Sequence, residues 1–220
     1  MPLELHHAHP WDLPAGEAIA LQEKLRERVV IQLLELGAIK TVAGVDASYR
    51  GGQARAAAVV LGFPALEPLE QAVCQMPVSF PYVPGLLSFR EAPVILEALS
   101  RLKTTPDVLI VDGHGLAHPR RFGLACHLGV LLELPSLGCA KSILIGEAAP
   151  PGEAPGDASE LIWQGELLGM ALRTRAFARP VYVSVGHRID LPSAVRVVLA
   201  CGSGYRSPEP TRLAHRLAAQ

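Results

Sequence analysis

The chain has 220 residues, of which 50% are hydrophobic, 19% are charged and 5% are aromatic. The high hydrophobic fraction excludes disorder of the whole chain. A folded chain of this length buries roughly 70% of the surface that its unfolded form exposes. Its apolar runs are far shorter than the roughly 18 to 20 residues of a membrane-spanning helix. We therefore expect a single globular domain, residues 1–220, in which residues 1–14 form a loosely ordered lead segment.

The N-terminal sequence has neither the apolar core nor the cleavage site of a secretory signal peptide, which predicts a cytoplasmic protein. The four cysteines are scattered, which fits neither a disulfide framework nor a thiolate zinc site. We expect them to be buried as small hydrophobic residues.

Charge is distributed unevenly along the chain, although the formal net charge is only -1. Residues 1–170 carry 19 acids and 12 bases, a net charge of -7, whereas residues 171–220 carry 2 acids and 8 bases, a net charge of +6. All eight of those bases are arginine. Such a basic segment is either a surface that binds phosphate groups or an ordinary solvated face.

Hydrophobic spacing predicts an amphipathic helix over residues 16–37, ending at Gly37. Three β-rich runs separated by Gly and Pro turns predict an antiparallel meander over residues 41–50, 54–63 and 66–78. The segment SFPYVPG, residues 79–85, is expected to be a stiff loop before a helix over residues 86–102.

The second half alternates between strands and helices. Buried strands are expected at residues 106–115, 136–146 and 179–186, with helices at residues 121–134, 191–200 and 210–219. Residues 147–159 are rich in Pro, Gly and Ala, which predicts a loop. The element order predicts an α/β fold with a mixed sheet, three antiparallel strands followed by parallel strands, flanked by helices. This order resembles the ribonuclease H-like architecture.

Two of the six aspartates, Asp46 and Asp112, come directly after apolar β-runs. An ionised carboxylate beside a hydrophobic strand needs a hydrogen-bonded turn, a charged partner or a metal ion. Each aspartate could simply cap a turn, but two of them on neighbouring strands favour a shared cation site. Glu91, early in the helix after the proline loop, is placed either to interact with the helix dipole or to complete the oxygen ligands that Mg²⁺ prefers.

Lys141 interrupts the apolar run CAKSILIG, where a lysine is costly to bury unless it meets an anion. It either extends its ammonium group to solvent at the strand end or pairs with the carboxylates or a substrate phosphate. His114 and His118 are four residues apart, but the glycines between them and Pro119 argue against a helical zinc pair. We expect them to lie in a loop.

Five strings occur in order along residues 15–217: VAGVDASY, PYVPGLLSFRE, VDGHGLAHPRRFGLACHLG, CAKS and PEPTRLAH. Together they resemble the endonuclease V family. The resemblance implies a ribonuclease H-like fold and a Mg²⁺-dependent site in which Mn²⁺ can substitute. It also implies hydrolysis of the second phosphodiester bond 3′ to deoxyinosine or another deaminated base in DNA, leaving 3′-hydroxyl and 5′-phosphate ends.

The resemblance also implies roles for individual residues. Asp46, Asp112 and Glu91 match the family's metal-binding carboxylates, Lys141 matches its active-site lysine, and His215 falls where members carry Asp or His. Tyr82 matches the wedge that fills the duplex when the lesion leaves the stack. The lesion pocket is expected to be formed by Gly85, Leu87, Gly113 and Leu124, with His118 as a supporting residue.

Three other functions fit parts of the sequence. A sugar kinase or actin-like protein also begins with a strand bearing Asp, but it needs two lobes and a glycine-rich turn, whereas Ala-Ser-Tyr-Arg follows Asp46. An inosine-specific ribonuclease on the same fold remains open, because the sequence does not distinguish DNA from inosine-containing RNA. A non-catalytic inosine-binding module is disfavoured by the intact set of Asp46, Glu91, Asp112 and Lys141.

Overall fold

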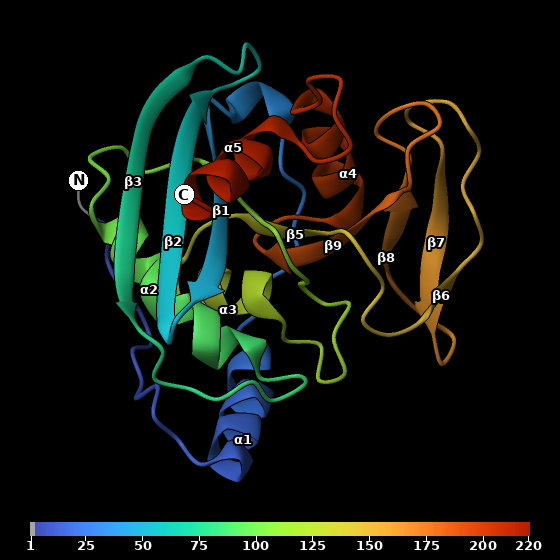
Figure 1. Cartoon of the computed structure of the whole chain (residues 1–220). Helices are drawn as coiled ribbons and strands as arrows, with labels where there is room; N and C mark the ends of the chain where they lie inside the picture. The colour runs from blue at the N-terminus through green and yellow to red at the C-terminus, as the bar shows by residue number, and fades with distance from the viewer. Residues whose placement is uncertain (1–2) are drawn as a thin grey trace.

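The computed structural model describes residues 3–220. A sheet of nine strands runs through it in the order β3-β2-β1-β4-β5-β9-β8-β7-β6 (Figure 1). The strands are β1 (Thr41–Arg50), β2 (Gln53–Gly62), β3 (Pro68–Pro77), β4 (Val108–Val111), β5 (Ser136–Ala140), β6 (Glu147–Ala148), β7 (Ala158–Trp163), β8 (Glu166–Leu172) and β9 (Val181–His187). The helices are α1 (Ala15–Arg26), the short 3-10 helix η1 (Leu36–Ala38), α2 (Leu87–Ser100), α3 (Leu124–Leu132), α4 (Leu191–Ala200) and α5 (Glu209–Ala218). The predicted mixed α/β sheet with flanking helices is confirmed.

The direction of the strands determines where functional side chains can meet. β1, β2 and β3 form the predicted antiparallel meander, and β4 and β5 run parallel to β1. β9 runs antiparallel to β5, so the parallel part is confined to three strands among the described residues. Val45 of β1 pairs with Val111 of β4, which brings the residues that follow them, Asp46 and Asp112, to the same edge of the sheet.

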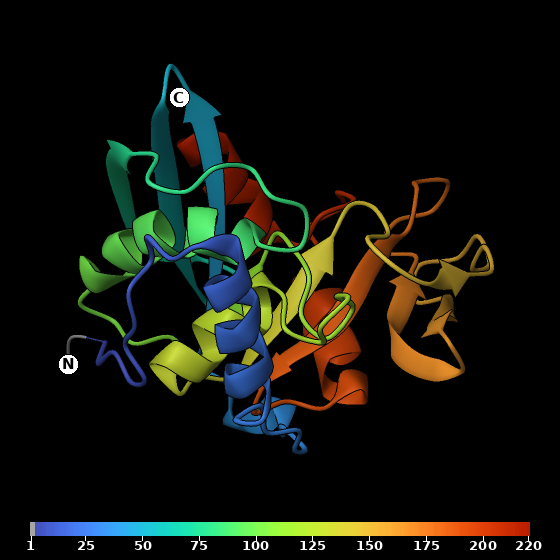
Figure 2. The same ribbon diagram turned by 90° about the horizontal axis from the view of Figure 1, so that it is seen from below.

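Helices cover both faces of the sheet (Figures 1 and 2). On one face, α2 and α3 pack on alternate β1 residues such as Ala43 and Val45. On the other face, α4 and α5 pack on residues such as Val42 and Val59. Because successive side chains of a strand point to opposite faces, β1 contributes to both hydrophobic clusters.

Gly44 lets α5 approach β1 closely. A Cβ atom at this position would overlap the backbone carbonyl group of Pro210, in the first turn of α5. Only a residue without a side chain leaves room for this contact. This contact sets the position of α5 on β1, and Gly44 lies only two residues before Asp46.

The helix predicted over residues 16–37 is wrong in its second half. α1 ends at Arg26, and the following segment is extended: the Val30 amide donates to His187 Nδ1 (3.2 Å) and the Arg188 amide donates to the Val30 carbonyl (2.7 Å). The β-branched residues Val29, Val30 and Ile31 lower the helix propensity of this segment. Hydrogen bonds to the end of β9 therefore prevail over the helical spacing of its apolar residues.

The region between β5 and β9 contains a hairpin that the predictions omitted. β7 and β8 are joined by Gln164 and Gly165, both with positive φ, at 53° and 79°. Two consecutive residues of this conformation form the turn that matches the twist of a hairpin. The strand predicted over residues 136–146 ends at Ala140, and the loop predicted over residues 147–159 holds only β6 and the start of β7 as regular structure.

The lead segment contacts the rest of the chain, although residues 1–2 of it lie outside the described residues. The His6 amide donates to the Leu131 carbonyl (2.6 Å), and His9 stacks on His127 with ring centroids 4.9 Å apart. All four cysteines are free and buried, as predicted. Within residues 3–220, no helix has the length and apolarity needed to cross a membrane. The single-domain organisation stays a prediction.

Replacing Gly44 with Ala should displace α5 from β1. We expect the free energy of unfolding to fall by about 1 to 3 kcal/mol, the usual cost of forcing extra atoms into a packed site. Urea unfolding measures this change. Gly37→Ala is the matched control, because a Cβ atom there meets no atom within 4 Å. Equal stabilities of the two variants would show that α5 can shift without cost.

Candidate active site

Three of the expected residues form a cluster suited to a metal ion. Asp46, Asp112 and His215 each offer one ligand atom, and these atoms lie within 4.8 Å of one another. His215 Nδ1 is 2.6 Å from an oxygen of the Asp46 carboxylate. The cluster therefore combines two oxygen ligands with one imidazole nitrogen at a partly exposed edge of the sheet.

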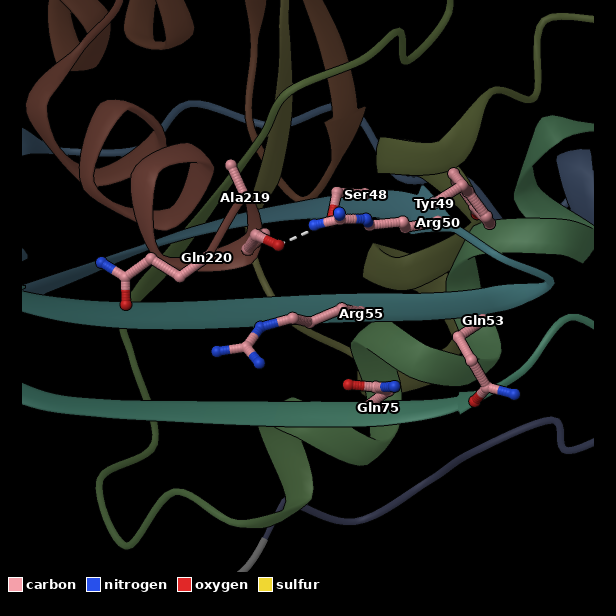
Figure 3. Close-up of a pocket in the computed structure, with 9 residues that line it drawn as sticks. Ser48, Tyr49, Arg50, Gln53, Arg55, Gln75, Ala219 and Gln220 are labelled. Carbon is pink, nitrogen blue, oxygen red and sulfur yellow. Dashed lines mark hydrogen bonds between the residues drawn. The ribbon is translucent and has the colours of Figure 1, made fainter.

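The cluster is built by β1, β4 and α5. Asp46 lies within β1 and Asp112 directly follows β4, while α5 carries His215 across the face of β1. The Ser48 hydroxyl donates to the Ala218 carbonyl (2.6 Å) and holds the last turn of α5 on the strand. Figure 3 shows this contact beside a hollow that extends to Arg50 and Arg55. None of the expected site residues lines this hollow.

Glu91 lies close to the cluster but is not one of the three grouped ligands. Burial, followed by the charges of Asp46 and Asp112, raises the pKa of Glu91 to about 8. Burial and the charge of Asp112 also raise the pKa of Asp46. The carboxylates thus repel one another in a poorly solvated space, and a bound cation would relieve this repulsion.

Lys141 supplies one internal positive charge. Its ammonium group pairs with Asp112, and its side chain is 40% exposed while that of Asp112 is 12% exposed. The expectation that Lys141 interrupts a buried strand is wrong, because β5 ends one residue earlier and the segment after it, although rich in apolar residues, is exposed or half-buried. The pairing with a carboxylate, one of the two alternatives drawn from the sequence, is present.

A pocket of about 230 Å³ opens beside the cluster. All six residues expected to contact or support the lesion line it: Tyr82, Gly85, Leu87, Gly113, His118 and Leu124. The sequence reasoning missed other lining residues, among them Ser88, His114 and Leu144. Each of these lies within three residues of an expected site residue, which is the signal that could have identified them.

Gly85 is held in place by three side chains that bind its carbonyl oxygen. His118 Nε2 lies 3.0 Å from this oxygen, Arg120 donates to it over 2.5 Å, and Gln22 donates to it over 3.2 Å. Burial, with the charge of Arg120, lowers the pKa of His118 to about 4, so the ring is neutral at pH 7. Its Nδ1 accepts from the Arg120 amide (3.2 Å), which leaves Nε2 as the donor to Gly85.

Tyr82 lies at the rim of the pocket and is 71% exposed. The loop that carries it is anchored by the buried Phe80, whose carbonyl accepts from Arg90 (3.2 Å). Pro81 and Pro84 flank Tyr82 and restrict the backbone on both sides. An exposed aromatic ring is therefore presented on a stiff support.

His114 and His118 lie in the loop after β4, as predicted, and neither belongs to the metal cluster. Burial lowers the pKa of His114 to about 4, and its Nδ1 is buried without a hydrogen-bond partner among the described residues. Both imidazoles face the pocket instead. They contribute to its polar lining as neutral rings.

Two carboxylates at the same edge of the sheet, one of them paired with a lysine, on a sheet of this topology, define a nuclease of ribonuclease H-like fold. The family model for endonuclease V matches residues 23–216. The chain belongs to the endonuclease V family.

Relatives and solved structures of this family match nearly the whole chain. Endonuclease V of Roseiflexus castenholzii is 56% identical over 96% of this chain and 95% of its own length. The crystal structure of endonuclease V from Streptomyces avermitilis has a TM-score of 0.91 and 42% identity, covering 100% of this chain and 96% of its own. Endonuclease V of Ciona intestinalis, solved with DNA containing an inosine followed by a ribo-adenosine, has a TM-score of 0.84 and 29% identity over 93% and 95% of the two chains.

The raised pKa of Glu91 predicts a pH dependence of stability in the metal-free protein. The folded state holds this proton up to about pH 8, whereas the ordinary pKa is 4.5, so its stabilising effect is complete below pH 4.5 and is lost as the pH rises through 8. The thermal midpoint in EDTA should therefore fall by roughly 3 to 5 °C per pH unit on account of Glu91 in this window.

Glu91→Gln should remove that part of the slope, because a glutamine does not titrate. Glu97→Gln, on the exposed side of the same helix, is the control and should keep the slope of the wild type. Parallel slopes for all three proteins would contradict the assigned environment of Glu91.

Proposed function

We propose that this protein is a Mg²⁺-dependent repair endonuclease that recognises deoxyinosine and other deaminated bases in DNA. It hydrolyses the second phosphodiester bond 3′ to the lesion and leaves 3′-hydroxyl and 5′-phosphate ends. The observation that carries this proposal is the position of a metal-suited carboxylate cluster directly beside a largely apolar pocket, with Gly113 in the pocket wall and Asp112 in the cluster. The cytoplasmic location stays a prediction.

The donor set fits the proposed metal ion. Mg²⁺ prefers carboxylate oxygens and keeps several waters, and Mn²⁺ suits the same oxygen ligands. Asp46 and Asp112 supply the carboxylates, His215 the nitrogen, and Glu91 a further carboxyl group that a cation would deprotonate. When bound, the metal supplies charge neutralisation at the scissile phosphate and a more acidic water.

The protein's own residues orient the reacting groups. Asp46 and Asp112 would hold the metal ion whose positive charge attracts the phosphate, and they would thereby define the position of the phosphate. We assign Lys141 the role of balancing the negative charge that develops during hydrolysis. Its pairing with Asp112 supports this role, because the ammonium group is already held at the cluster. Hydrolysis by an activated water requires no nucleophilic side chain.

Recognition requires that the damaged base leave the duplex. Unstacking costs a few kcal/mol, and the cost is least for a mismatched base, which provides part of the selectivity. We assign the pocket at Gly85, Leu87, Gly113 and Leu124 to the extruded base and Tyr82 to the space that it leaves. The three hydrogen bonds to the Gly85 carbonyl support this assignment, because they fix one wall of the pocket before any base binds.

A second candidate is cleavage of inosine-containing RNA by the same site. The relative from Ciona intestinalis was solved with DNA in which a ribo-adenosine follows the inosine. A ribonucleotide at that position is therefore compatible with binding in the family. A non-catalytic inosine-binding module is not favoured, since the carboxylate cluster, Lys141 and membership of a nuclease family all support hydrolysis.

Matched DNA and RNA oligonucleotides with a single inosine test the proposed function. In Mg²⁺ the DNA duplex should be nicked at the second phosphodiester bond 3′ to inosine, with no nicking in EDTA or at an adenine control. Cleavage of the RNA alone would select the second candidate. Cleavage of neither oligonucleotide would overturn both.

Asp112→Asn should lower single-turnover cleavage by about 10²-fold or more while the protein stays folded, since it replaces a charged metal ligand with a neutral amide and leaves the core intact. Ca²⁺ should support binding of the lesion without turnover, because its looser coordination places the attacking water poorly. Asp12→Asn, an exposed carboxylate of the lead segment, is the control. Undiminished cleavage by Asp112→Asn would exclude the cluster as the site of chemistry.

Tyr82→Ala should weaken discrimination between inosine-containing and undamaged duplex by about 1 to 3 kcal/mol, the range for one lost stacking contact. Competition binding with the two duplexes measures this difference. Leu69→Ala, another exposed apolar side chain at 51% exposure, is the control. Discrimination equal to that of the wild type would mean that the loop is structural only.

A further inference from the structure

The loop between β8 and β9, residues 173–180, carries an exposed aromatic ring between two arginines. Phe177 is 87% exposed, and Arg175 and Arg179 are exposed on either side of it. The segment contains no acidic residue. Within residues 3–220, neither Arg175 nor Arg179 has an ion pair or a side-chain hydrogen bond. A large apolar group and two unpaired charges therefore face solvent together.

The base of this loop is braced, so the exposed ring is not the tip of a loose segment. The guanidinium group of Arg173 donates to the Ala178 carbonyl within the loop. The same group donates to the carbonyls of Gly152 (2.9 Å) and Pro151 (3.0 Å) in the neighbouring loop. Phe177 also has a positive φ of 59°, which is unfavourable for a bulky residue and which the rest of the loop must impose.

Arg206 connects the loop to the segment that carries Lys141. Its guanidinium group donates to the carbonyls of Pro180 (2.8 Å) and Lys141 (2.5 Å). Its own carbonyl accepts from the Thr174 hydroxyl (2.6 Å). In Figure 2 the loop, drawn in orange, lies on the upper side of the molecule, toward which the C-terminal ends of β1 and β5 point. The loop thus belongs to the same edge as the metal cluster.

We propose that Phe177, Arg175 and Arg179 form a second contact for the nucleic-acid strand, outside the lesion pocket. An unpaired flanking base of the strand would stack on Phe177, and the two guanidinium groups would bind neighbouring phosphates. Base stacking on an aromatic ring and phosphate binding by arginine are both indifferent to sequence. The inference rests on the proposed function in that the strand held here is the one that reaches the cluster.

An anionic membrane surface would also attract a ring flanked by arginines. The nucleic-acid strand is favoured because the loop is hydrogen-bonded through Arg206 to the Lys141 segment, which places it beside the site where a phosphodiester is expected. A membrane would have to approach the same edge and cover the cluster. Binding to vesicles is therefore included as an outcome of the test.

Binding of oligonucleotides in EDTA, followed by fluorescence anisotropy at several salt concentrations, tests the inference. Phe177→Ala should weaken binding of inosine-containing and undamaged duplexes with single-stranded ends alike, by about 5- to 150-fold, while Phe177→Trp should keep it. Replacing both Arg175 and Arg179 with Gln should lower the slope of log Kd against log salt by about 1.4 to 1.8, because two phosphate contacts are lost. Unlike Tyr82→Ala, none of these variants should change the ratio of the two affinities.

The matched controls are Ile31→Ala, an apolar side chain 59% exposed, and Arg101→Gln, at the end of α2. Thermal midpoints confirm that each variant is folded. Oligonucleotides are shortened stepwise from the 5′ side and from the 3′ side. Shortening from one of the two sides should remove the difference in affinity between Phe177→Ala and the wild type.

Affinities of Phe177→Ala within twofold of Ile31→Ala would overturn the inference. So would an unchanged salt slope in the double arginine variant, or a loss that affects only vesicles of anionic lipid. Failure of the proposed function would look different. The wild type would then bind inosine-containing and undamaged duplexes equally, while the loss caused by Phe177→Ala would still be measurable on both.

Discussion

Repulsion between carboxylates is the constraint around which this edge of the sheet is arranged. Parallel pairing of β1 and β4 puts Asp46 beside Asp112, and α2 adds the half-buried Glu91. Three such groups cannot all ionise in a poorly solvated space without a positive charge nearby. Lys141 supplies that charge at Asp112, and the imidazole of His215, carried by α5, lies against Asp46. Electrostatic attraction therefore holds these strands and helices together at this edge in addition to hydrophobic packing. The carboxylates between them form a site that suits a divalent cation.

The pocket and the carboxylate cluster share the elements that build them. Gly113 faces the pocket and its neighbour Asp112 faces the cluster, while Leu87 and Glu91 are one helical turn apart on α2. Leu144 and Lys141 make a third such pair on the segment after β5. A base in the pocket would therefore lie at a fixed offset from the cluster, set by covalent geometry rather than by the flexibility of a domain hinge. The proposed cleavage at one defined bond from a lesion would require an offset of this kind.

The sequence predicted the elements whose signal is local. The meander, the proline loop, α4 and α5 follow from periodicity and from Gly and Pro. The residues expected at the pocket line it, and three of the four expected metal ligands meet, with Glu91 outside the group. What failed depends on contacts between distant segments. Residues 29–35 have helical spacing, but the amide of Val30 finds an acceptor on His187, which no local pattern reveals. Lys141 looked buried because the apolar run continues past it, whereas the strand stops where β9 ceases to pair. The hairpin at Gln164 and Gly165 had a local signal, the two-residue turn between alternating apolar runs.

The contact between Asp46 and His215 joins residues 169 positions apart in the chain. At about 5 to 20 residues per second, a ribosome makes the second of them roughly 10 to 30 s after the first. During that interval the nascent chain carries the carboxylates of β1 and β4 but not the helix that Gly44 admits onto the strand. The metal cluster cannot assemble until α5 has emerged and docked. Synthesis thus delays the completion of a site suited to cutting nucleic acid until α5 is in place.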